Sequence, residues 1–183
     1  MTSLGNYASA SVLSCNSLLC NNITAVTLNP KNTLTQVYGK FDLSQNTSVN
    51  GTLTTIGNWQ PTSILKNVAV LPDDGAQGNA KFVVTQVGLY EVTTNLEIDN
   101  GANEILSVES RVVLYPSTSV AGGAVTTFGG ATTWRKNTQI NIVQFEITDP
   151  TTQYFEIEGK CAFTGTIPTY QTTYTHVFIR KIV

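Results

Sequence analysis

The stretch Lys81–Asp99, KFVVTQVGLYEVTTNLEID, decides the fold class of this 183-residue chain. Most of its apolar residues fall on one parity, while Thr85, Glu91, Thr93, Asn95 and Glu97 fall on the other. Successive side chains of a β-strand point to opposite faces of the sheet, so the alternation predicts a strand with one buried face. A bend is expected at the glycine. The parity expected to be buried comprises Phe82, Val84, Gly88, Tyr90, Val92, Leu96 and Ile98.

Segments of the same kind follow along the chain, separated by turn residues at the spacing typical of a β-sandwich or barrel. Charged residues make up only 12% of the chain, and Thr and Val are plentiful. This composition favours strands over helices. We therefore predict an all-β fold, a single jelly-roll β-sandwich of about eight to ten antiparallel strands. The expected strands are Ile23–Leu28, Thr33–Leu43, Val49–Ile56, Ser63–Leu71, Lys81–Asp99, Glu104–Tyr115, Ala124–Phe128, Thr138–Thr148, Gln153–Phe163 and Tyr174–Val183.

One of these segments, Thr138–Thr148, changes parity half-way. Ile140 and Ile142 lie on one parity, and the second half has its apolar residues on the other, at Val143, Phe145 and Ile147. A β-bulge adds one residue to a strand and lets both sets face the same core. We predict such a bulge near Ile142 or Val143. Glycine pairs such as Gly122-Gly123 are expected in turns between strands.

Residues 1–30 contain no charged side chain and are expected to form an extended N-terminal arm and first strand, ahead of a jelly-roll domain at residues 31–183. The apolar side chains of the arm need a surface to cover them. The arm lies either on a neighbouring subunit or back on its own domain. Trp is favoured at interface centres, although either Trp could equally be buried in the core. The candidate interface residues are Leu4, Tyr7, Leu13, Leu18, Leu19, Trp59 and Trp134.

The charge and the cysteine content of the chain restrict which partners and which cellular compartment we expect for it. The formal net charge of -2 offers no cationic field for nucleic acid, so direct nucleic-acid binding is not expected. We see neither a signal peptide nor an apolar run for membrane insertion. The odd set of Cys15, Cys20 and Cys161 argues against a fully paired disulfide framework and favours a reducing compartment.

Residues that commonly carry chemistry are sparse. His176 is the single histidine, and no second histidine is available for a metal cluster or a catalytic pair. Asp73-Asp74-Gly75 and Asp99-Asn100-Gly101 could supply oxygen ligands to calcium, but neither matches an ordered calcium loop and both suit turns. We predict no cofactor, no metal site and no catalytic residue, hence a protein that is not an enzyme.

Phe82, Gly88 and Tyr90 fit the pattern Phe-x5-Gly-x-Tyr-x-[Phe/Val], and residues 82–92 thereby resemble the C1q and tumour-necrosis-factor (TNF)-like jelly rolls. The resemblance implies that the Gly and Tyr lie on a central strand, with the Tyr packed into the core. Later segments share only general features with these folds, namely short strands and a final apolar strand that runs to Val183. Fold resemblance alone does not fix function.

Single jelly rolls of this kind also resemble capsid subunits of icosahedral viruses, including penton and minor capsid proteins of large DNA viruses. The odd thiol count, the missing secretion signal and the uncharged arm favour that interpretation. The leading prediction is a structural capsid protein in the virion, synthesised in the host cytoplasm, that forms a pentamer at a five-fold vertex and contacts other capsid proteins. The alternatives are a trimeric C1q- or TNF-like binding module and a receptor-binding head of a viral or phage fibre.

Overall fold

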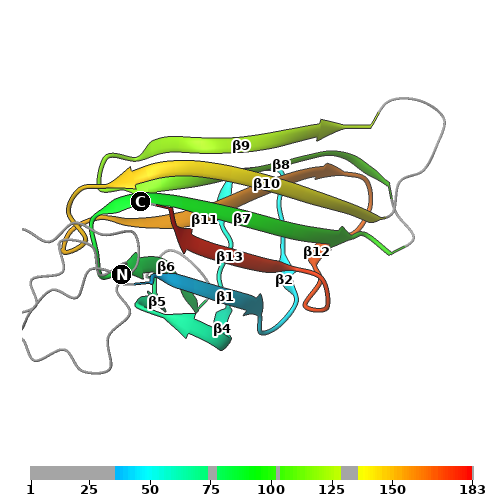
Figure 1. Cartoon of the computed structure of the whole chain (residues 1–183). Helices are drawn as coiled ribbons and strands as arrows, with labels where there is room; N and C mark the ends of the chain where they lie inside the picture. Colours follow the sequence, from blue (N-terminus) through cyan, green and yellow to red (C-terminus); the bar gives the residue numbers. More distant parts are fainter. Residues whose placement is uncertain (1–35, 74–77, 102–103, 129–135, 183) are drawn as a thin grey trace, which may run out of the picture. The chain divides into compact units, whose positions relative to one another are not determined.

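Two antiparallel β-sheets pack face to face in the computed structural model, which describes residues 36–73, 78–101, 104–128 and 136–182 (Figure 1). The predicted all-β jelly roll is confirmed. The described strands are β1 (Tyr38–Leu43), β2 (Thr47–Ser48), β3 (Thr54–Thr55), β4 (Trp59–Lys66), β5 (Val68–Pro72), β6 (Asn79–Val84), β7 (Gly88–Asp99), β8 (Ile105–Tyr115), β9 (Ser119–Thr127), β10 (Lys136–Ile147), β11 (Tyr154–Phe163), β12 (Thr169–Tyr170) and β13 (His176–Lys181).

The first sheet, sheet A, has the strand order β2-β12-β7-β13-β1-β4, and β10 pairs with the other side of β7. The second, sheet B, has the order β5-β6-β11-β8-β9, with β3 also paired to β11. Strands distant in sequence therefore lie side by side, as in the pairing of β1 with the C-terminal β13. Within the described ranges, no helix is long and apolar enough to cross a membrane.

Several predicted strands are divided or displaced. Lys81–Asp99 is two strands, β6 and β7, and the chain bends before Gly88, whose φ of 147° a side chain would rarely adopt. Ser63–Leu71 is also two strands, β4 and β5, broken at Asn67 with a φ of 58°. Asn tolerates this left-handed conformation better than most residues, so the break falls where the chain can turn.

The glycine pair Gly122-Gly123 lies inside strand β9 and not in a turn, which corrects our expectation. A Cβ atom on Gly123 would lie 2.5 Å from the carbonyl oxygen of Ser110 on β8. The glycines therefore allow β9 to approach its neighbour closely at a point where the β8–β9 register shifts. The predicted strand Ile23–Leu28 lies outside the described residues.

Aromatic rings fill the centre of the sandwich between the sheets. Phe82 packs edge-on against Phe41 and stacks on Phe155, with ring centroids 5.1 and 5.2 Å apart, respectively. Trp59 completes the cluster at 5.9 Å from Phe82 and donates its indole N–H to the carbonyl of Ile56. Offset and edge-on ring pairs are favourable beyond the area that they bury, so these residues tie both sheets together.

Candidate interaction surface

Strand β10 buries its polar side chains and exposes its apolar ones over four residues. Ile140 and Ile142 are 62% and 66% exposed, whereas Gln139 and Asn141 are 3% and 6% exposed. The predicted bulge is wrong, because β10 pairs with β7 in unbroken register from Lys136 to Ile147. The odd-numbered residues, which are buried in the second half of the strand, are therefore also the buried ones in the first half. Two large apolar side chains are left in water, where a partner could cover them.

A buried hydrogen-bond network accounts for this orientation. The Ser110 hydroxyl, on β8, donates to Gln139 Oε1 at 2.5 Å and accepts from Asn141 Nδ2 at 2.6 Å. Gln139 Nε2 donates to the carbonyls of Ala124 on β9 and Val108 on β8, at 2.9 and 3.3 Å. Buried polar groups are costly unless they are hydrogen-bonded, and here the amide of Gln139 has a partner at each atom.

Strand β9 carries exposed apolar side chains at the same edge of the sandwich as β10. The two strands run side by side at one margin of the sandwich, where each is the last strand of its sheet (Figure 1). Val120 and Val125 of β9 are 52% and 66% exposed, and β9 contains no charged residue. Val120 and Val125 face outward from sheet B, whereas Ile140 and Ile142 face outward from sheet A. We call this edge, with these four side chains, the β9–β10 margin. An edge with exposed apolar side chains is a ready site for association.

The outer face of sheet A carries a second weakly polar region. The pairing of β10, β7 and β13 puts Ile142, Thr93 and Phe178 in one row across the sheet, and Ile140, Asn95 and His176 in the next. We call the four of these residues that lie on β7 and β13 the sheet A patch, and we count Ile140 and Ile142 with the β9–β10 margin beside it. It contains no carboxylate and no ammonium group. The side-chain oxygen of Asn95 is buried and has no hydrogen-bond partner among the described residues.

Ion pairs border the sheet A patch on one side. Arg180 Nη2 lies 2.6 Å from Glu91 Oε1, and Gln144 donates to the other carboxylate oxygen at 3.0 Å. The hydrogen bond from Gln144, followed by those from Arg180, lowers the pKa of Glu91 below its ordinary value. Charged groups therefore stand at the rim of the patch and uncharged groups within it, and depletion of charge at the centre is common in protein interfaces.

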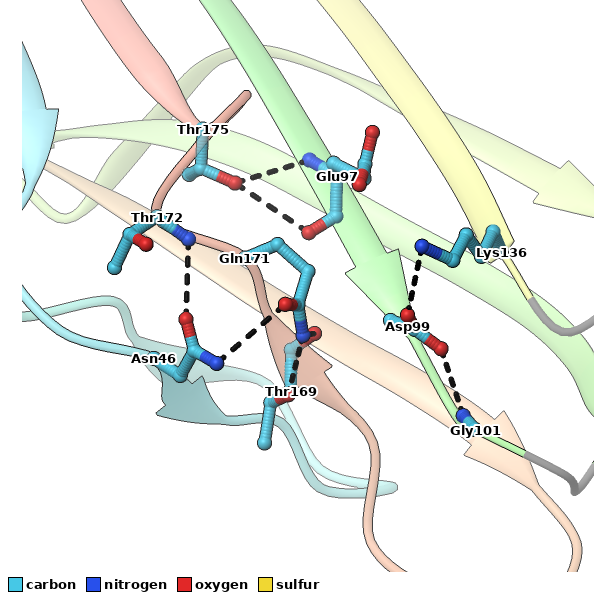
Figure 2. A network of polar contacts seen from close by, with 9 residues as sticks. All are labelled: Asn46, Glu97, Asp99, Gly101, Lys136, Thr169, Gln171, Thr172 and Thr175. Carbon is cyan, nitrogen blue, oxygen red and sulfur yellow. Dashed lines mark hydrogen bonds and ion pairs between the residues drawn. The ribbon is translucent and has the colours of Figure 1, made fainter.

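A polar network lies at the other end of sheet A (Figure 2). Asn46 accepts from the backbone N–H of Thr172 at 3.1 Å and donates to Gln171 at 3.4 Å. The hydroxyl of Thr175 accepts from the backbone N–H of Glu97 at 3.1 Å. These contacts join the chain after β1 to the chain after β12 and to β7. The arrangement fixes the loops at this end of the sheet.

Asp99, also in Figure 2, has a partner for each carboxylate oxygen. The backbone N–H of Gly101 donates to one at 2.7 Å, and Lys136 Nζ lies 3.0 Å from the other. Burial opposes ionisation, but the contacts with Gly101 and Lys136 prevail and lower the pKa of Asp99. The geometry is that of a turn, in agreement with the turn interpretation of this segment. No group of three metal-binding side chains occurs among the described residues.

The outer face of sheet B carries ion pairs on its central strands, β8 and β11. Arg111 Nε lies 2.6 Å from Glu158 Oε2, and Lys160 Nζ lies 2.6 Å from Glu109 Oε2. These side chains remain partly exposed, and charges that stay in contact with water suit a solvated surface. The patch and margin defined above are therefore the better candidates for contact with another protein.

The structure places the residues singled out from the sequence in different environments. Phe82 and Tyr90 are buried in the core, and the Tyr90 hydroxyl donates to the carbonyl of Gln86 at 2.7 Å. Trp59 is 1% exposed and lies in the core, so its assignment as an interface residue is wrong. His176 lies in the sheet A patch. The interface candidates Leu4, Tyr7, Leu13, Leu18, Leu19 and Trp134 lie outside the described residues.

Sequence reasoning missed Ile140, Ile142 and the two valines of β9 as surface residues. Their hydrophobicity pointed to the core, and only the change of parity within residues 138–148 signalled an irregularity. Nothing in the sequence near β10 identifies Ser110 as the partner of Gln139, because the two are 29 residues apart.

Solved structures provide the comparison with known proteins. Murine APRIL at pH 5.0 superposes with a TM-score of 0.57 at 10% identity, over 80% of this chain and 99% of that one. The Eiger TNF of S. frugiperda gives a TM-score of 0.57 at 9% identity, over 81% of this chain and 93% of that one. The fold is a TNF-like jelly roll. No family model and no curated protein sequence matches this chain.

Proposed function

We propose that this protein is a self-associating, non-enzymatic binding module of the TNF-like kind, in which the β9–β10 margin of one copy packs against the sheet A patch of the next. The observation that carries the proposal is the exposure of Ile140 and Ile142 over buried Gln139 and Asn141. In an isolated domain, the two exposed isoleucines cost free energy because water contacts them. A neighbouring copy that covers them removes this cost.

The β9–β10 margin and the sheet A patch consist of different residues, so contact between them is head to tail. Head-to-tail contacts form a closed ring when the rotation between copies closes. A trimer is the order that the resemblance to C1q and TNF-like folds implies, and the similarity in fold to APRIL and the Eiger TNF supports this choice over a pentamer.

Burial of the two isoleucines contributes a substantial part of the association free energy. Complete burial of a large aliphatic side chain is worth about 1.5–3 kcal/mol, so two that are now about two-thirds exposed contribute about 2–4 kcal/mol per contact. Each copy of a closed ring makes two such contacts, once with each surface. The ion pair of Glu91 and Arg180 at the rim adds orientation more than affinity.

The native mass of the full chain, measured by light scattering or native mass spectrometry, tests the proposal. We expect a trimer for the wild type and monomers for Ile142→Glu, because a carboxylate cannot be buried in an apolar contact. Ile167→Glu is the matched control, since Ile167 is 55% exposed but lies outside both surfaces. A wild-type monomer, or equal loss of association in both variants, would refute the proposal.

The capsid function stays a prediction from sequence, together with its virion localisation and capsid partners. The same measurement separates the two ideas, because a pentamer would favour the five-fold vertex over the trimeric module. A fibre head would also be trimeric.

A further inference from the structure

The buried network around Ser110 joins the two sheets at the margin where β9 and β10 meet. Within the described strands, no backbone pairing connects β9 to β10. The side-chain amide of Gln139 bridges the margin instead, through the carbonyl of Ala124. Hydrogen bonds have strict distance and angle requirements, whereas apolar packing has none of comparable sharpness. The network is thus the feature of this margin best able to specify how β10 is aligned.

A second alignment of β10 competes with the observed one. A bulge near Val143 would turn Ile140 into the core and Gln139 and Asn141 into water, as the hydrophobic pattern favours. The observed alignment exposes two isoleucines and gains the hydrogen bonds to Ser110. Without the hydroxyl of Ser110, Gln139 Oε1 and Asn141 Nδ2 would each lose the partner described above, and the balance would move toward the bulged alignment.

We propose that Ser110 and Gln139 are positioning residues for self-association, because they hold β10 in the alignment that displays Ile140 and Ile142 to a neighbouring copy. The inference rests on the proposed function for its biological meaning. The alignment itself can be measured independently of the oligomeric state.

A pair of introduced thiols reports the alignment. Ile142 on β10 lies directly opposite Thr93 on β7, a separation that a disulfide can span. The reporter chain therefore carries Thr93→Cys and Ile142→Cys, with Cys15→Ser and Cys20→Ser to remove other reactive thiols. Cys161 can remain, because it is fully buried. Oxidation with copper phenanthroline followed by peptide mass mapping gives the yield of the intramolecular disulfide.

The test substitution is Ser110→Ala in the reporter chain, and Ser107→Ala is the matched control. Both serines lie on β8, but Ser107 is half-buried on the parity of the outward-facing Glu109 and makes no hydrogen bond to β10. We expect Ser110→Ala to lower the disulfide yield several-fold and Ser107→Ala to leave it unchanged. In the chain without introduced thiols, Ser110→Ala should weaken self-association about tenfold or more.

A rescue variant separates this role from a general loss of stability. Gln139→Leu and Asn141→Leu, added to Ser110→Ala, make the inward positions apolar and should restore both the disulfide yield and association. An unchanged disulfide yield in Ser110→Ala would overturn the inference, and so would failure of a well-folded rescue variant to recover that yield. If the yields follow expectation while the wild type is monomeric, the alignment role stands and the proposed function fails. If the wild type is trimeric and Ser110→Ala changes neither yield nor association, the inference fails alone.

Discussion

Replacement of Phe82 tests whether the aromatic cluster holds the two sheets together. Phe82 is fully buried and contacts the rings of Phe41, Phe155 and Trp59. Ring pairs contribute about 0.5–1.5 kcal/mol each beyond area burial, so Phe82→Leu should lose about 1.5–4.5 kcal/mol of unfolding free energy. Phe82→Ala, which also leaves a cavity, should lose about 3–5 kcal/mol. Since domains of this size are stable by about 5–15 kcal/mol, either loss is readily measured.

Urea unfolding, followed by circular dichroism at two protein concentrations, gives the values and separates association from folding. Phe163→Leu is the control, because Phe163 is half-buried against the core and has no ring partner among the described residues. We expect the control to lose less than about 1.5 kcal/mol. A loss for Phe82→Leu no larger than that of the control would refute the idea that ring contacts at Phe82 join the sheets.

Three further predictions concern the interior of the protein and its response to pH. Gly159→Ala should destabilise the fold by about 1–3 kcal/mol in the same urea assay, because a Cβ atom there would collide with the Tyr170 hydroxyl; Tyr170→Phe should recover part of the loss. Burial raises the pKa of Glu156 above its ordinary value of 4.5. The contribution of this carboxyl group to the stability of the fold is therefore fully present below pH 4.5 and is lost as the pH rises through the folded-state pKa. Glu156→Gln should remove this part of the dependence of stability on pH. Burial also raises the pKa of Cys161 to about 11. In a chain with Cys15→Ser and Cys20→Ser, we expect a thiol reagent at neutral pH to modify Cys161 in urea but not in the native protein, and rapid native labelling would contradict the burial.

The fold class could be predicted because a strand with one buried face has a local alternation of apolar and polar residues. Alternation in Lys81–Asp99 identified the buried parity of β6 and β7 correctly, including Phe82 and Tyr90. The boundaries were less accurate, since single residues with positive φ, such as Asn67, end strands without interrupting the apolar pattern. Short strands such as β12 leave too few residues for an alternation to be recognised.

The candidate surface could not be predicted because its cause is not local. In Gln139–Ile142 the hydrophobic pattern and the hydrogen-bonding requirements of Ser110 oppose each other, and the pattern alone gave the bulge that the structure lacks. The position of Gly122-Gly123 inside β9 has a similar origin, because the close approach of β8 is invisible from the sequence of β9.

By itself, the sequence determined the class of this protein: an all-β sandwich, whose strands reveal their buried faces through a period of two. Tertiary structure alone decided which apolar side chains remained outside. Ser110 meets Gln139 across 29 residues of sequence and Asn141 across 31, and only the packing of sheet A on sheet B brings them together. The need to pair buried polar groups then outweighs the burial of two isoleucines, and the surface proposed for self-association is the result.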